Sequence, residues 1–138
     1  MKIFIDTNVL ISAFISHGAC NELFVHCMTR HHVYTSEFVL QELARTLSKK
    51  FKYPADEIEQ ARKIILSGAV VVAEADLNQQ ISKDEDDDHI IAAAIHADVD
   101  CIVSGDDDLL NLKKIQDIRI LSPRDFWVFE EVFFQSTD

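Results

Sequence analysis

The most constraining feature of the sequence is a regular alternation between short apolar runs of strand length and longer segments with helical spacing. The predicted strands are residues 2–6, 33–35, 69–73, 101–103 and 117–121. The predicted helices are residues 7–14, 20–29, 36–48 with Ser36 as N-cap, 54–66, 90–97 and 107–112, followed by a last helix that starts at Pro123. Strands that alternate with helices favour a mainly parallel sheet covered by helices, so we expect one α/β domain over residues 1–138. The apolar β-branched run at 69–73 predicts a strand that is covered on both faces.

Composition places the chain among soluble globular proteins, with 138 residues, 48% of them hydrophobic and 27% charged. No apolar run approaches the roughly 18 residues that a membrane span needs, and the stretch after Met1 is too short for a secretory signal. The cysteines, Cys20, Cys27 and Cys101, are odd in number and lack C-x-x-C spacing. We therefore expect buried thiols in a reducing cytoplasm rather than disulfides or a zinc–thiolate site.

The net charge of −11 argues against a general nucleic-acid binder, because affinity for phosphate usually comes from Lys and Arg. Acidic residues often serve only to keep a surface soluble. When they are clustered, however, they can bind hard divalent cations, which take oxygen ligands. The positions of the acids along the chain therefore decide between these interpretations.

Four acids occupy positions where a parallel sheet would bring them together. Asp6 ends the first predicted strand, Asp106 follows the fourth, Asp88 lies in the first turn of the helix before the fourth strand, and Glu42 lies in the helix after the second. Ligands of open α/β sheets bind beyond the carboxyl ends of the strands, so we expect these carboxylates to converge there. An all-oxygen pocket selects Mg²⁺ or Mn²⁺ over zinc, and such ions assist phosphodiester hydrolysis by activating water and stabilising charge.

Each acid taken alone also has a purely structural interpretation. The alternatives are a helix N-cap for Asp6, a turn or cap position for Asp106, a charge that favours the helix dipole for Asp88 and a solvated helix position for Glu42. The joint pattern of the four acids, rather than any one of them, favours the metal site.

Four ordered motifs resemble those of the PIN-domain family, in particular its VapC-like group of toxin components. Residues 4–10 (FIDTNVL) resemble the family's hydrophobic-Asp-Thr-Asn start, and residues 36–43 (SEFVLQEL) resemble its second motif, which ends in Glu-Leu. Residues 84–94 (DEDDDHIIAAA) resemble its acidic helix start, and residues 103–110 (VSGDDDLL) its Thr-Gly-Asp-x-Asp-Leu-Leu stretch. Residues 120–126 resemble the family's last strand and helix, so the resemblance covers nearly the whole chain.

The resemblance implies a three-layer α/β/α sandwich and a Mg²⁺- or Mn²⁺-dependent endonuclease that acts on single-stranded or structured RNA. It also implies a homodimer and, in toxin–antitoxin pairs, a cognate antitoxin that inserts into the active groove. The residues that match the family's metal-binding acids are Asp6, Glu42, Asp88 and Asp106. Asn8 and Ser104 match polar positions that steady the site, and the Ser104 hydroxyl can hydrogen-bond a carboxylate as the family's Thr does.

The acidic motifs leave some assignments open. Asp84 also falls at a family acid, and Asp87 competes with its neighbour Asp88. Asp88 is favoured because it directly precedes the apolar helix pattern. Asp108 is a fifth acid that could join the site or simply cap a helix. Because the chain is so acidic, RNA would need a local basic strip, for which the candidates are Arg45, Lys49, Lys50 and Lys52, although a solvated helix face explains them as well.

Two other groups of side chains are assigned structural roles. The histidines lack a transition-metal ligand pattern, and we expect surface or packing roles for His26, His31, His32, His89 and His96. Aromatic side chains near the end of the chain are expected to pack the last helix, with a dimer or antitoxin contact as the alternative: Phe126, Trp127, Phe129, Phe133 and Phe134.

Two other functions compete with the nuclease. A catalytically silent PIN-like module would bind RNA or a protein partner without cutting, but such a module would not need the full set of acids. A phosphatase of the haloacid dehalogenase type would place a second Asp two residues after the first, where this chain has Asn8.

Overall fold

The computed structural model describes residues 1–136, and its centre is a six-stranded sheet with the order β3-β2-β1-β4-β6-β5. The neighbouring strands run parallel, except that β5 pairs antiparallel with β6. The strands are β1 (Lys2–Ile5), β2 (His32–Thr35), β3 (Ala69–Val71), β4 (Cys101–Val103), β5 (Lys114–Ile115) and β6 (Ile118–Leu121). The prediction of a mainly parallel sheet is confirmed.

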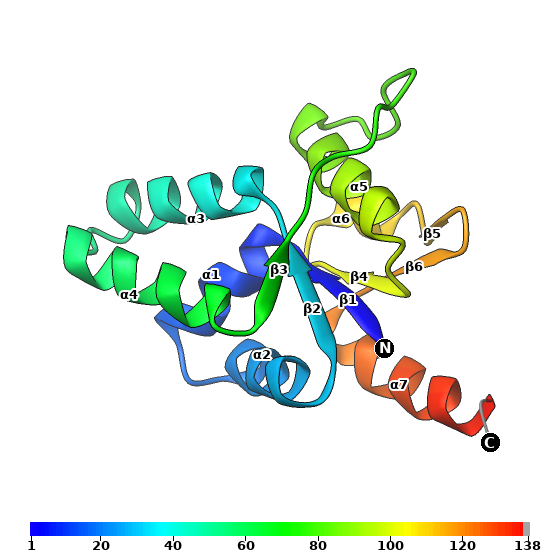
Figure 1. Cartoon of the computed structure of the whole chain (residues 1–138), viewed down its shortest axis with the longest axis horizontal. Coiled ribbons are helices and arrows are strands. Elements are labelled where there is room, and N and C mark those ends of the chain that lie inside the picture. The colour runs from blue at the N-terminus through cyan, green and yellow to red at the C-terminus, as the bar shows by residue number, and fades with distance from the viewer. Residues whose placement is uncertain (137–138) are drawn as a thin grey trace.

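Helices cover both faces of this sheet, as Figure 1 shows, with α1 to α4 on one side and α5 on the other. The helices are α1 (Thr7–Ile15), α2 (Ala19–Arg30), α3 (Glu37–Lys49), α4 (Ala55–Leu66), α5 (Glu85–Ala97), α6 (Asp107–Leu110) and α7 (Pro123–Ser136). The last helix, α7, contacts both α2 and β6. The three-layer α/β/α sandwich is therefore confirmed.

The central strand β1 determines where a ligand can bind. Its residues Ile3, Phe4 and Ile5 are almost completely buried, because β1 has a parallel neighbour on each side and helices above and below. From β1 the chain builds the sheet first outward through β2 and β3, and then in the opposite direction through β4 and β6. The strand order thus reverses between β1 and β4, and such a switch point leaves a crevice at the carboxyl ends of the two strands.

Two element predictions need correction, and one strand was not predicted. The strand at 69–73 is the shorter edge strand β3, and Val70 and Val71 are 53% and 38% exposed rather than covered, because β3 has a neighbour on one side only. The helix at 107–112 ends at Leu110. The hairpin partner β5 was not predicted, since two residues carry no periodicity; positive φ angles at Lys113 (63°) and Gln116 (53°) form the bends on either side of it.

The sequence correctly predicted the residue at which α3 begins. Ser36 is the N-cap of α3 and accepts a hydrogen bond from the Val39 N–H at 3.3 Å, as its residue type predicts.

The three cysteines are free thiols, and Cys27 and Cys101 are buried among apolar side chains. Within residues 1–136, none of the helices is both long and apolar enough to cross a membrane.

Candidate metal centre

Asp6 lies at the crevice between β1 and β4 and is held from two directions. It is 6% exposed and is the N-cap of α1. One carboxylate oxygen, Oδ1, accepts a hydrogen bond from the Thr7 N–H at 2.7 Å, and the other, Oδ2, accepts one from the Ser104 hydroxyl at 2.7 Å. The capping interpretation of Asp6 is thus confirmed, and the same side chain lines the acidic pocket at this crevice.

The turn after β4 positions a second carboxylate beside the first. The Ser104 hydroxyl donates to Asp6 and its oxygen accepts the Asp106 N–H at 2.9 Å, so one side chain links the two acids. Asn8 accepts the Gly105 N–H through its Oδ1 at 3.3 Å and so connects α1 to the same turn. Ser104 and Asn8 therefore connect the turn after β4 to Asp6 and to α1.

The start of α5 contributes Asp84 and Asp87. Asp84 caps the helix and accepts the Asp86 N–H at 2.9 Å, while Asp87 is buried and accepts the Ser82 hydroxyl at 3.1 Å. Carboxylate oxygens of Asp84, Asp87 and Asp106 all lie within 4.8 Å of one another. This grouping brings together two acids from α5 and one from the turn after β4.

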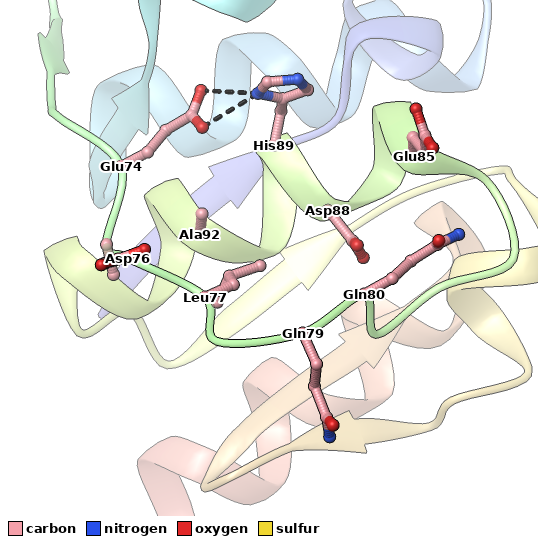
Figure 2. A pocket seen from close by; sticks show the side chains of 10 residues that line it. Glu74, Asp76, Leu77, Gln79, Gln80, Glu85, Asp88, His89 and Ala92 are labelled. Carbon is pink, nitrogen blue, oxygen red and sulfur yellow. Dashed lines mark hydrogen bonds and ion pairs between the residues drawn. The ribbon is translucent and has the colours of Figure 1, made fainter.

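The structure places Asp87, not the favoured Asp88, in this group. The Asp88 carboxylate accepts the N–H groups of Ile81 at 3.0 Å and Ser82 at 2.8 Å, and so holds the segment before α5. Figure 2 shows Asp88 on the face of α5 that points toward the 74–80 segment, where it lines a pocket of about 450 Å³ together with Gln80. That pocket is larger than the acidic one, but none of the other predicted acids lines it.

The helical spacing explains this correction. Asp87 precedes the buried residues Ile90, Ile91 and Ala94 by three, four and seven positions, which is the spacing of one helix face. Adjacent residues on a helix point about 100° apart, so Asp88 cannot share the direction of Asp87. Counting back from the buried face, rather than choosing the acid next to the apolar run, would have identified Asp87.

These acids line a small pocket of about 110 Å³ at the carboxyl edge of the sheet. Glu42 reaches it from α3 and is half-buried, with Arg45 Nη2 4.0 Å from its Oε2. The lining residues are Asp6, Asn8, Glu42, Asp84, Asp86, Asp87, Ile90 and Asp106. Three of the four predicted acids therefore meet here, and Asp84, Asp86 and Asp87 join them from α5.

Burial, together with the crowding of carboxylates, raises the pKa of two acids in this pocket. Burial raises the pKa of Asp6 from its ordinary 3.8 to about 6; the hydrogen bonds from Ser104 and Thr7 oppose this effect, and repulsion from Glu42 and Asp106 adds to it. The pKa of Asp87 is also raised, first by burial and then by its hydrogen bond with Asp106 and their mutual repulsion. Like charges packed in this way are unfavourable without a cation.

The donor set suits a hard divalent cation. The pocket offers carboxylate oxygens and the amide of Asn8, and no imidazole or thiol is among the residues of 1–136 that line it. Mg²⁺ and Mn²⁺ prefer such oxygen ligands, and their charge would compensate the repulsion between the carboxylates. The residues present thus fit a magnesium-type ion, with Asp6 and Asp106 held in place by Ser104.

The chain matches a known protein family over most of its length. Residues 2–108 match the sequence profile of the PIN domain, over a span that contains every acid of the pocket. The chain belongs to the PIN-domain family. An uncharacterized protein of Methanocaldococcus jannaschii is 29% identical to this PIN-domain protein, over 91% of this chain and 89% of the relative.

Solved structures share the fold of this PIN domain at low sequence identity. The VapBC2 structure from Rickettsia felis, bound to a promoter DNA fragment, has a TM-score of 0.62 and 17% identity, and covers 87% of this chain and 97% of its own. Mycobacterium tuberculosis VapC20, a toxin that cleaves the sarcin–ricin loop, has a TM-score of 0.61 and 16% identity over 85% and 98% of the two chains. FitAcB from Neisseria gonorrhoeae has a TM-score of 0.55 and 13% identity over 88% and 97%.

The remaining predicted residues of this PIN domain lie around or away from the pocket. The Asp108 N–H donates to Asp106, but the residue itself lines a different pocket with Asn111 and Lys83, so it does not join the acidic group. The basic residues that follow Glu42 in sequence are exposed along and just beyond the end of α3: Arg45, Lys49, Lys50 and Lys52.

The histidines and aromatic residues divide between packing and surface positions. Phe126 is fully buried and Phe129 packs against the core, as predicted, whereas Trp127 and Phe134 are partly exposed. His89 stacks on Phe38 with ring centroids 4.2 Å apart and pairs with Glu74 at 2.9 Å. His26 and His31 lie near α7, at the amino ends of the strands and away from the acidic pocket.

Proposed function

We propose that this protein is a Mg²⁺- or Mn²⁺-dependent endoribonuclease that hydrolyses phosphodiester bonds of RNA, and that it is the toxin of a toxin–antitoxin pair. The observation that carries the proposal is the convergence of Asp6, Glu42, Asp87 and Asp106 in one all-oxygen pocket at the carboxyl edge of β1 and β4. Membership of the PIN-domain family and the resemblance of the four motifs to the VapC-like group support the reaction and the substrate.

In this proposal the metal ligands are Asp6, Asp87 and Asp106, with Glu42 and Asp84 beside them. A bound Mg²⁺ or Mn²⁺ would supply an activated water and neutralise charge on the phosphate. The chain's own part is to hold the carboxylates in place. Ser104 fixes the direction of both Asp6 and Asp106, and Asn8 fixes the turn that carries Asp106.

The RNA backbone would approach along α3. Glu42 lies in the pocket and Arg45 is one turn further along the same helix, with Lys49 at its end. Exposed cations placed in this way would offset the repulsion that an acidic protein exerts on phosphate, and their contribution should fall as salt rises. Lys49→Gln and Lys50→Gln together should raise KM for RNA and flatten its salt dependence, with kcat unchanged.

The proposal is tested by cleavage of a mixed pool of single-stranded RNA in Mg²⁺, in Mn²⁺ and in EDTA. The wild type should cut with either metal and not in EDTA. Asp106→Asn should lose cleavage by 100-fold or more, on the order of the loss seen when a group that stabilises the transition state is removed. Asp107→Asn is the matched control, because Asp107 is the exposed neighbour outside the pocket and should cut like the wild type.

Folded wild-type protein that binds RNA but never cuts it would reject the nuclease in favour of a silent PIN-like binding module. Equal loss of cleavage in Asp106→Asn and Asp107→Asn would reject the assignment of the pocket. Calorimetric titration of Mn²⁺ on the same variants separates a metal-binding defect from a defect in RNA binding.

We also propose protein partners: a second copy of the chain and a cognate antitoxin. The edge strand β3 supports a partner, because Val70 and Val71 are exposed beside its unpaired edge, and Ile64 of α4 is exposed as well. Exposed strand edges are templates for pairing with another chain. Light scattering should give the mass of a dimer for the wild type, and Val70→Lys should weaken whichever assembly uses this edge.

A further inference from the structure

A second cluster of metal-ligating side chains lies between α2 and α7, away from the acidic pocket. The Nε2 atoms of His26 and His31 lie 2.6 and 2.5 Å from the same Oε2 of Glu130. The ligand atoms of the three residues lie within 4.8 Å of one another. His26 belongs to α2, His31 is the C-cap of α2, and Glu130 belongs to α7, so residues about a hundred positions apart meet at one point.

The surroundings of this cluster favour a defined geometry. The side chains of His31, Glu130 and His26 are 2%, 16% and 23% exposed. The His26 ring lies against Trp127 at 4.6 Å between centroids, and the His31 ring lies edge-on to the buried Phe126 at 6.1 Å. The rings are thus held by packing, and the exposed edge of His26 leaves a path for an ion from solvent.

The ligand atoms also point at a common position. Nε2 of His26 and Nε2 of His31 both face the same oxygen of Glu130, where each ring donates a hydrogen bond to the carboxylate. Transition metals bind neutral imidazole through its unprotonated nitrogen, so metal binding requires each ring to carry its proton on Nδ1 instead of Nε2.

We propose that His26, His31 and Glu130 form a binding site for a transition-metal ion of the zinc class that joins α7 to α2. Two imidazole nitrogens and one carboxylate oxygen match the two-His, one-Glu ligand set of zinc sites, with water as the fourth ligand. Zinc-to-ligand distances of about 2.1 Å place tetrahedral donors roughly 3.4 Å apart. The Glu130 oxygen therefore needs to withdraw from each imidazole by roughly 1 Å, a motion that side-chain rotation provides.

This site is chemically and spatially distinct from the acidic pocket. His31 immediately precedes β2, at the amino ends of the strands, whereas Asp6 and Asp106 follow β1 and β4 at the carboxyl ends. Imidazole selects zinc-class ions, and an all-carboxylate pocket selects magnesium-class ions. Excess Mg²⁺ should consequently fill the acidic pocket and leave the histidine site free.

The test is a titration of the EDTA-treated, dialysed full-length protein with Co²⁺ in the presence of excess Mg²⁺, followed by visible absorption. Tetrahedral Co²⁺ absorbs strongly in the visible range and reports a zinc-type site. The wild type should show a band that saturates at one Co²⁺ per chain and that Zn²⁺ displaces. His26→Gln should weaken Co²⁺ binding by about tenfold or more, and Glu130→Gln should do the same.

Two controls separate this site from other sources of binding. His32→Gln removes an exposed histidine next to the site, and Asp106→Asn disables the acidic pocket; both should keep the Co²⁺ band. RNA cleavage in Mg²⁺ should be unchanged in His26→Gln. If Glu130→Gln proves poorly folded, His26→Gln carries the test, because His26 is the most exposed of the three ligands.

Thermal unfolding provides a second readout. Zn²⁺ should raise Tm for the wild type and His32→Gln, but not for His26→Gln. The proposal is overturned if the wild type shows no Co²⁺ band, if His26→Gln binds Co²⁺ as tightly as the wild type, or if Asp106→Asn abolishes the band. In those cases the three side chains form a hydrogen-bonded contact between α2 and α7 and nothing more.

Discussion

Replacing Asp6 by Asn should stabilise the metal-free protein at neutral pH while it removes metal binding. The raised pKa of Asp6 means that the folded protein holds a proton there more tightly than the unfolded chain does. Its favourable contribution to folding is complete below about pH 4 and is lost as pH rises through about 6, where the buried carboxylate must ionise. Asn has nearly the same shape as Asp but never carries this charge.

The size of the effect follows from the two pKa values. A rise from 3.8 to about 6 corresponds to roughly 3 kcal/mol of unfolding free energy lost by the wild type between acidic and neutral pH. Asn keeps one acceptor oxygen for the Thr7 N–H, but its amide nitrogen cannot accept the hydrogen bond from the Ser104 hydroxyl, a loss of about 1 kcal/mol. In EDTA at pH 7, Asp6→Asn should therefore be more stable than the wild type by about 2 kcal/mol, and at pH 4 the advantage should disappear.

Urea unfolding in EDTA, followed by circular dichroism at several pH values between 4 and 7, measures this difference. Comparison of the two proteins at each pH cancels the titration of groups that they share. Adding Mg²⁺ or Mn²⁺ at pH 7 should stabilise the wild type and leave Asp6→Asn unchanged. A stability difference that is the same at every pH, or a variant less stable than the wild type at pH 7 in EDTA, would refute the assignment of a buried carboxylate with a raised pKa at Asp6.

The neighbouring acids and the serine that links them give further tests. Asp87→Asn should abolish metal-dependent RNA cleavage with little loss of stability. Asp88→Asn should still cleave RNA, but its free energy of unfolding in urea should fall by about 1–3 kcal/mol, because the hydrogen bonds of Asp88 to Ile81 and Ser82 are charge-assisted. The reverse pattern would restore Asp88 to the site. Ser104→Ala removes the hydroxyl between Asp6 and Asp106 and should weaken Mn²⁺ binding by about 10- to 100-fold in calorimetry, while Ser104→Thr should retain it. Unaltered Mn²⁺ affinity in Ser104→Ala would show that the two carboxylates need no common support.

Most of the fold was predictable because the signals are local. The buried residues of β1 form an uninterrupted apolar run, and Ser36 is of a residue type that commonly begins a helix, as it does for α3. The alternation of such strands with helices is enough to predict a parallel sheet, and a parallel sheet gathers residues such as Asp6 and Asp106 at one edge. The edge strand β3 was misjudged, because an apolar run records what a strand prefers and not whether a neighbour exists to cover Val70.

The sequence by itself thus determined the sheet, the edge where chemistry is possible and the type of ligand that acids supply there. The tertiary structure alone decided which of two adjacent acids faces that edge, because Asp87 and Asp88 differ by about 100° around α5 and only the packed helix has a direction. It also decided that His26 and His31 meet Glu130, since no spacing within α2 reveals a partner about a hundred residues away. Local patterns specify elements, whereas contacts between distant residues exist only after the elements have packed.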